Sequence, residues 1–319
     1  MAANLVLEDP ALKIVFFGSD DFAAAHLQAL LTSEHRVVGC VTQPDKPQDR
    51  GMKVAVSPVK TAALQQGVPV LQPEDIKDAR LLTALTNLAA DLFLVIAYGR
   101  FLPDTLLALP RLGAINVHGS LLPKYRGAAP INWAIINGET ETGLTLIKMN
   151  PQMDAGEILA QHKMQIAPDE TAVSLRERMK QAGPGFLLTY LREWEALRLA
   201  GKSQDPNAVT FAPKLYKENG RMDWARSAVE LERLVRGLQP WPCAHTTFKG
   251  KLLKILRAAV VPGKAAKPGQ IFEIQKAGFL VGTGREGLLI SVVHPESSRL
   301  MEAADFIHGC HLSVDDHFE

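Results

Sequence analysis

Residues 92–119 read LFLVIAYGRFLPDTLLALPRLGAINVHG and contain two apolar segments separated by a stretch with two prolines. We predict strands over LFLVIAYG and GAINVHG and a short helix over LPDTLLAL. Strands that are apolar at nearly every position, rather than at every second one, are typical of a parallel sheet buried on both faces. This stretch therefore predicts an α/β fold.

The same alternation continues on both sides of this stretch. Before it, the apolar runs KIVFFG, RVVGCVTQ and VPVLQP predict strands, and FAAAHLQALL, SPVKTAALQQG and ARLLTALTNLAA predict helices. After it, GLTLIKM and EILAQHKMQI predict two strands joined as a hairpin-like extension. Residues 174–197 predict a helix that is interrupted at Gly183–Pro184–Gly185. We therefore expect a Rossmann-like, mostly parallel sheet with helices on both faces.

A change of composition divides the chain. Residues 201–213, GKSQDPNAVTFAP, are polar and contain proline and asparagine, as linkers do. Beyond them an amphipathic helix over residues 227–239 precedes short β-like runs with glycine turns, which indicate a small barrel or sandwich. We expect a catalytic domain over residues 1–203, a linker over 204–213 and a second domain over 214–319.

Composition excludes several classes of protein. The 35 Lys and Arg residues nearly balance the 34 Asp and Glu residues, so net charge points to no partner. Three widely spaced cysteines without a C-x-x-C pair argue against a disulfide framework and a zinc site. The first residues do not resemble a signal peptide, and no run approaches ~18 apolar residues. G-x-G-x-x-G and the P-loop pattern are absent, so neither a dinucleotide nor ATP is indicated. A cytoplasmic protein is expected.

A candidate site lies at the end of the strand GAINVHG. Asn116 and His118 are two residues apart, so their side chains point to the same face of the strand. Ligands of open parallel sheets bind beyond the carboxyl ends of the strands. An amide and an imidazole suit a reaction in which a carbonyl oxygen becomes an oxyanion. The alternative is a strand-end histidine with its hydrogen bonds satisfied and an asparagine in a turn.

Two further features have open interpretations. Asp154 precedes Ala-Gly and is either a turn residue or a carboxylate that orients His118. The stretch from Lys249 to Lys267 carries only basic charges, which suits either a solvated β surface or the phosphate backbone of a nucleic acid.

Several motifs resemble the methionyl-tRNA formyltransferase family of folate-dependent enzymes over nearly the whole chain. INVHGSLLPKYRGAAP resembles the signature of folate-dependent formyltransferases, and TQPDKPQDRGMKVAVSPVK resembles the family's basic loop after the second strand. AYGRFLP, ETGLTLIKM and MDAGEIL match in order and spacing. FAPKLYKENGRMDW and LQPWPCA resemble the C-terminal domain of the enzymes that act on tRNA, which is an OB-like β-barrel.

The resemblance implies transfer of a formyl group from 10-formyltetrahydrofolate to the α-amino group of methionyl initiator tRNA for translation initiation. It implies that Asn116 and a protonated His118 bind the developing oxyanion and that Asp154 fixes His118. No cofactor would be permanently bound, because the folate is a co-substrate, and no metal would be required. The folate is expected to lie along six residues: Ser120, Leu121, Leu122, Pro123, Tyr98 and Gly99.

The resemblance also implies contacts with the acceptor stem of the tRNA. The residues expected to make them are Arg50, Lys53, Lys249, Lys251 and Lys254. A monomer that does not bind membranes is expected. The alternatives are a glycinamide ribonucleotide formyltransferase, a 10-formyltetrahydrofolate hydrolase module, an amino-sugar-nucleotide formyltransferase and a non-catalytic RNA-binding protein. The second domain argues against a glycinamide ribonucleotide formyltransferase. The lack of room for a further large domain argues against the hydrolase module and the amino-sugar-nucleotide enzyme. The presence of Asn116, His118 and Asp154 argues against a non-catalytic protein.

Overall fold

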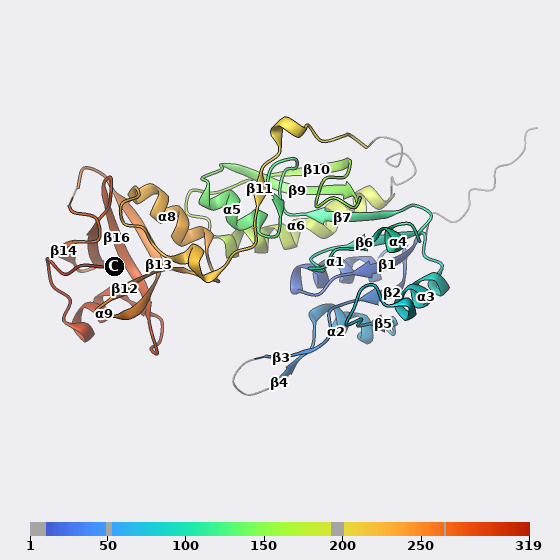
Figure 1. Ribbon diagram of the computed structural model, residues 1–319, viewed down its shortest axis with the longest axis horizontal. Coiled ribbons are helices and arrows are strands. Elements are labelled where there is room, and N and C mark those ends of the chain that lie inside the picture. Colours follow the sequence, from blue (N-terminus) through green and yellow to red (C-terminus); the bar gives the residue numbers. More distant parts are fainter. Residues whose placement is uncertain (1–10, 49–52, 193–200, 265) are drawn as a thin grey trace, which may run out of the picture. The chain divides into compact units, whose positions relative to one another are not determined.

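The computed structural model describes residues 11–48, 53–192, 201–264 and 266–319 (Figure 1). These residues form two compact units. The first comprises the described residues up to Gly127 together with Gly143–Met164 and Glu177–Phe211, and the second comprises Ala128–Thr142, Gln165–Arg176 and Ala212–Glu319. The functional division expected from the sequence, into residues 1–203, 204–213 and 214–319, remains a prediction.

The first unit is built on a seven-stranded sheet with the strand order β10-β9-β7-β6-β1-β2-β5. The pairs β1–β2, β2–β5, β1–β6 and β6–β7 are parallel, and β9 runs antiparallel to β7. The predicted Rossmann-like, mostly parallel sheet is therefore confirmed. The strands are β1 (Lys13–Phe17), β2 (Arg36–Val41), β5 (Val70–Leu71), β6 (Leu92–Val95), β7 (Ala114–His118), β9 (Glu141–Lys148) and β10 (Ile158–Gln165).

The central strands of this sheet are buried on both faces. Val15 and Phe17 of β1 and Phe93 of β6 pack into one apolar core with Leu85 of helix α3. Ile14 and Phe16 point to the opposite face and are equally inaccessible to water. This explains why the strands carry uninterrupted apolar sequences. The helices in order are α1 (Asp21–Leu31), α2 (Pro58–Gln65), α3 (Ala79–Leu88), α4 (Asp104–Leu107) and α6 (Ala172–Arg192).

The order of the strands creates the switch point at which such sheets bind ligands. From β1 the chain continues to β2 and β5 on one side and then crosses to β6 and β7 on the other (Figure 1). The connections that leave the carboxyl ends of β1 and β6 therefore run in opposite directions, which is the arrangement at which open α/β sheets bind ligands. Because β7 is the neighbour of β6, its terminal residues Asn116 and His118 lie at this edge.

The predicted interruption of the long helix is wrong. Helix α6 continues from Ala172 to Arg192 with Pro184 inside it. A Cβ atom on Gly183 would lie 2.4 Å from Nε2 of His26 in α1, so the glycine permits close packing of the two helices and does not end α6. His26 Nδ1 hydrogen-bonds to the Phe22 carbonyl oxygen at 2.8 Å, and burial lowers the pKa of His26 to about 4.

Substitution of Gly183 by alanine should therefore destabilise the protein. The added methyl group would overlap the His26 ring, which we expect to lower the free energy of unfolding by about 1–3 kcal/mol. Gly185→Ala is the matched control, since a Cβ there would meet no atom within 4 Å. In a helix this second change should raise the free energy of unfolding by about 0.5–1 kcal/mol. Urea denaturation of both variants would measure the difference, and equal effects would contradict the packing role of Gly183.

The second unit contains an antiparallel sheet with the strand order β12-β13-β16-β15-β14, and β17 pairs with β16. This confirms a separate β domain, whereas no closure of the sheet into a barrel is found among the described strands. Helix α9 at its end was not predicted from the sequence. The strands are β12 (Ala244–Phe248), β13 (Lys251–Val261), β14 (Ile271–Gln275), β15 (Gly278–Gly282), β16 (Gly287–Pro295) and β17 (Met301–Glu302), and the helices are α5 (Pro130–Ile136), α8 (Ala228–Gly237) and α9 (Ala303–Cys310).

The core of the second unit brings α5 and α8 together with the inner face of the sheet. Leu231 and Leu234 of α8 pack with Leu253 and Ile255 of β13. Ser227 caps α8 by accepting a hydrogen bond from the Glu230 amide, and the Glu230 carboxylate accepts one in return from the Ser227 amide. The hydrogen bonds from Ser227, with Arg226 nearby, lower the pKa of Glu230 to about 2. The amphipathic helix predicted here is confirmed.

Short elements complete the described chain. The strands β3 and β4 form an antiparallel hairpin in the segment where the sequence indicated a basic loop. Within the described residues, no helix has both the length and the apolar character needed to cross a membrane. The remaining elements are β3 (Lys46–Gln48), β4 (Lys53–Ala55), β8 (Arg126–Gly127), β11 (Phe211–Ala212) and the 3-10 helices η1 (Pro206–Ala208) and η2 (Lys217–Gly220).

Candidate active site

Asn116 and His118 lie at the end of β7, which pairs with the neighbouring strand β9. Asn116 pairs with Ile147 and His118 with Thr145. Asn116 is half-buried, and His118 is 6% exposed. In the described part of the chain, no residue hydrogen-bonds to the Asn116 side-chain amide. Its N–H groups are therefore available to a ligand at the carboxyl edge of the sheet.

The two ring nitrogens of His118 face different groups. Nε2 lies 2.9 Å from the carbonyl oxygen of Tyr125. A carbonyl oxygen only accepts hydrogen bonds, so Nε2 is the atom that carries a proton in this arrangement. Nδ1 lies 3.6 Å from Oδ2 of Asp154, which is too long for a direct hydrogen bond. The structure thus brings Asp154 to His118, with Nδ1 turned toward the carboxylate and not bonded to it.

Both neighbours of the His118 ring have unusual backbone conformations. The φ angle is 62° at Tyr125 and 49° at Asp154, in the left-handed region that residues with side chains rarely adopt. Each such residue costs about 1–2 kcal/mol. Conformations of this kind persist where surrounding contacts determine them, and they concentrate at functional sites. One of these contacts is the hydrogen bond of 2.9 Å from the Gly127 amide to Asp154 Oδ2.

The loop Ser120–Pro123, predicted to hold folate, is fixed by two polar side chains that the sequence analysis did not single out. Thr145 donates to the Ser120 carbonyl oxygen at 2.6 Å and accepts from the Leu122 amide at 3.1 Å. Gln161 donates to the Leu122 carbonyl oxygen at 2.8 Å. These partners come from β9 and β10, which the chain reaches more than 20 residues later, so local sequence could not identify them.

The predicted folate residues differ in their accessibility. Ser120 and Leu122 are buried, whereas Leu121 and Pro123 are partly exposed. Tyr98 is 1% exposed and packs edge-on against Phe17, so its side chain belongs to the core. Any contact of Tyr98 with folate would involve its backbone, next to the exposed Gly99. The folate assignment of these six residues remains a prediction.

The residues predicted to bind tRNA are only partly described. Arg50 lies outside the described residues, as does the side chain of Lys53. Lys249 and Lys251 are exposed at the turn between β12 and β13, and Lys254 projects from β13 between His245 and His294 on the adjacent strands. The ammonium of Lys249 stacks over the Phe248 ring at 4.8 Å and lies 3.9 Å from Asp316.

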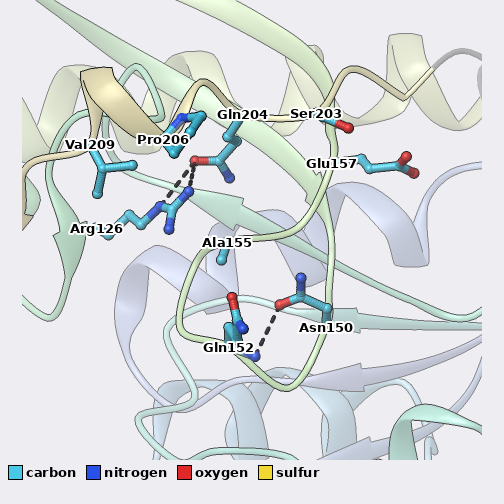
Figure 2. A pocket seen from close by; sticks show the side chains of 9 residues that line it. All are labelled: Arg126, Asn150, Gln152, Ala155, Glu157, Ser203, Gln204, Pro206 and Val209. Carbon is cyan, nitrogen blue, oxygen red and sulfur yellow. Dashed lines mark hydrogen bonds between the residues drawn. The ribbon is translucent and has the colours of Figure 1, made fainter.

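A pocket of about 370 Å³ adjoins the turn that carries Asp154. Arg126 and Gln204 form one wall, where Nε and Nη2 of Arg126 donate to Oε1 of Gln204 at 3.1 and 2.8 Å (Figure 2). Ala155 lies below them in the same view. The polar lining also includes Asn150, Gln152, Glu157 and Ser203. The pocket is therefore charged and polar rather than apolar.

No group of three or more His, Cys, Asp or Glu side chains in the described chain is arranged to hold a metal ion. Cys40 and Cys243 are buried free thiols, and burial raises the pKa of Cys40 to about 12. These two cysteines are packing residues in the two cores.

Family models match both parts of the chain. The formyl transferase model matches residues 12–191, and the model of the formyl transferase C-terminal domain matches residues 214–311. With the switch-point sheet and the Asn116–His118 edge, these matches define the class of the protein as a formyl transferase.

Similar proteins show which kind of formyl transferase this chain is. A methionyl-tRNA formyltransferase of Geobacter metallireducens is 42% identical over 301 residues, which cover 94% of this chain and 96% of the relative. One from Pseudomonas fluorescens is 43% identical over 298 residues, covering 93% of this chain and 94% of the relative. The chain belongs to the methionyl-tRNA formyltransferase family.

Solved structures share the fold at low identity. HypX from Aquifex aeolicus in complex with tetrahydrofolic acid aligns with a TM-score of 0.62 at 17% identity, covering 96% of this chain and 48% of that chain. The sugar 3N-formyl transferase WlaRD aligns with a TM-score of 0.64 at 17% identity, covering 90% and 99% respectively. These similarities support the fold of the chain and carry no information about its acceptor.

Proposed function

We propose that this enzyme transfers the formyl group of 10-formyltetrahydrofolate to the α-amino group of methionyl initiator tRNA, giving N-formylmethionyl-tRNA. Membership in the methionyl-tRNA formyltransferase family supports the acceptor. The observation that carries the chemistry is the group of Asn116, His118 and Asp154 at the carboxyl edge of β7, where the Asn116 amide has no hydrogen-bond partner among the described residues. The product would serve translation initiation in the cytoplasm, and the enzyme would act as a monomer.

In the proposed reaction, the free amine attacks the formyl carbon and the carbonyl oxygen becomes an oxyanion. The bond between the formyl carbon and N10 of the folate then breaks, and one proton moves from the amine nitrogen to N10. The products are tetrahydrofolate and the formylated amine. The folate is consumed, so no permanently bound cofactor and no metal ion are needed for this balance.

The geometry of the side chains suits these steps. Because Nε2 of His118 is engaged by the Tyr125 carbonyl oxygen, Nδ1 is the ring atom left for the substrate. A protonated Nδ1 and the Asn116 amide would together donate to the oxyanion. Asp154 Oδ2, at 3.6 Å from Nδ1, would hold the charged ring and accept a proton from the amine directly or through water.

Formyl transfer to methionyl initiator tRNA tests the proposal directly. Purified enzyme would be incubated with 10-formyltetrahydrofolate and charged initiator tRNA, with uncharged tRNA and methionyl elongator tRNA as controls. Transfer confined to charged initiator tRNA is expected. Turnover of folate without formyl transfer would support the proposed chemistry of the site and contradict the proposed acceptor.

The second unit is proposed to bind the acceptor stem through Lys249, Lys251 and Lys254, together with Arg50 and Lys53 of the first unit. Lys251 is the clearest test, because it is exposed at the start of β13 and has no acidic partner among the described residues. Lys249, by contrast, lies near Asp316.

Lys251→Ala should weaken tRNA binding without changing the KM for folate. Loss of one phosphate contact should reduce the slope of log K against log salt by about 0.7–0.9. Lys276→Ala, in the exposed β14–β15 turn, removes the same charge and is the matched control. Filter binding across a salt series would measure the tRNA affinity of both variants. Identical losses of affinity would indicate a general effect of charge instead of a contact made by Lys251.

A further inference from the structure

Residues 202–210, which overlap the predicted linker, lie against the part of the first unit that carries Tyr125 and Asp154. We call this segment the strap. At its beginning, Lys202 and Ile158 exchange two backbone hydrogen bonds of 2.8 Å, which dock the strap on the first residue of β10. At its end, the Thr210 carbonyl oxygen accepts from the Arg126 amide at 2.9 Å. The strap is thus fixed at both ends to the unit that carries His118.

Gln204 of the strap holds the turn around Asp154. Its Nε2 donates to the carbonyl oxygens of Asp154 and Gly156 at 2.8 and 2.7 Å. Its Oε1 accepts both hydrogen bonds from the Arg126 guanidinium (Figure 2). Both N–H groups and the oxygen of the amide are therefore used.

The strap also holds Tyr125, the other neighbour of the His118 ring. The hydroxyl oxygen of Thr210 accepts from the Tyr125 amide at 2.9 Å, and the Tyr125 carbonyl oxygen is the partner of His118 Nε2. Tyr125 and Asp154 are the two residues with left-handed backbone on either side of the imidazole. Both unfavourable conformations are thus fixed by hydrogen bonds from one short segment.

We propose that Gln204 is a positioning residue that sets the Asp154 carboxylate opposite His118, and that the strap is part of the active site. This rests on the proposed formyl transfer. Gln204 contacts the backbone of Asp154 and not its carboxylate, so its loss would displace the carboxylate without removing it. Displacement by about 1 Å can slow a reaction by ~100-fold. The substrates themselves would still bind.

Gln204→Ala should lower kcat for formyl transfer by about 10–100-fold and leave both KM values within about twofold. Gln204→Glu keeps an acceptor for Arg126 but turns an oxygen toward two carbonyl oxygens. Its kcat should therefore fall at least as far as that of Gln204→Ala. Gln204→Asn keeps the amide with a shorter reach and provides a third variant should the others be unstable. Gln181→Ala, an exposed glutamine of α6, should have the rate of the parent enzyme.

A double-mutant cycle with Asp154→Asn distinguishes positioning from a general structural role. If Gln204 acts through Asp154, adding Gln204→Ala to Asp154→Asn should reduce kcat by no more than about twofold further. Multiplicative losses, or a raised KM with unchanged kcat, would overturn the inference. Absence of formyl transfer by the parent enzyme would instead reject the proposed function, so the two failures are distinct.

Discussion

His118→Ala should lower kcat for formyl transfer by about 10²–10⁴-fold, the range for loss of a general acid or base. The variant loses the only imidazole at the edge of β7 in the described chain, and with it the ring nitrogen Nδ1 that faces Asp154. The KM for folate should change little, because the loop Ser120–Pro123, which is predicted to hold folate, is held by Thr145 and Gln161 and not by His118. Single-turnover measurements with saturating substrates would report the chemical step.

The stability of His118 variants must be measured alongside their rates. His118 is 6% exposed and bonded to the Tyr125 carbonyl oxygen, so alanine leaves a buried acceptor without its donor. We expect the free energy of unfolding to fall by about 1–3 kcal/mol. His118→Gln places an amide donor near the Tyr125 carbonyl oxygen and should recover part of this stability without recovering activity. A well-folded His118→Gln enzyme with near-normal kcat would refute the catalytic assignment.

Asn116→Ala should lower kcat by about 10²–10³-fold, as removal of one oxyanion donor does in other enzymes. In contrast to His118, this change should leave the free energy of unfolding within about 0.5 kcal/mol, because no described residue hydrogen-bonds to the Asn116 amide. Asn116→Asp preserves shape but places a negative charge beside the developing oxyanion, and should be slower than the alanine variant. Faster transfer by Asn116→Asp would show that the side chain does not face the oxyanion.

The sequence was sufficient for the sheet and for the position of Asn116 and His118 at the end of β7. Uninterrupted apolar strands could only be buried on both faces, and the spacing of two between Asn116 and His118 placed them on one face of β7. The approach of Asp154 to His118 could be proposed only by resemblance. It depends on the antiparallel pairing of β9 with β7, which no local pattern encodes.

Other parts of the structure could not be predicted for identifiable reasons. The Gly183–Pro184–Gly185 tripeptide favours a break locally, but contact with His26 makes a glycine necessary within α6. Tyr98 lies in a motif typical of the folate site, yet its ring fills the core beside Phe17. Gln204 stands in a polar segment typical of linkers, and only the fold shows that its amide meets Asp154 and Arg126.

The strap has a consequence for how this enzyme could be dissected or recombined. The match to the formyl transferase model ends at residue 191, before the strap begins. A truncated protein cut at that point would retain Asn116, His118 and Asp154 but lose the hydrogen bonds that hold Tyr125 and Asp154. We therefore expect that a functional module, or a chimaera that receives a foreign C-terminal domain, needs the native chain through at least Thr210.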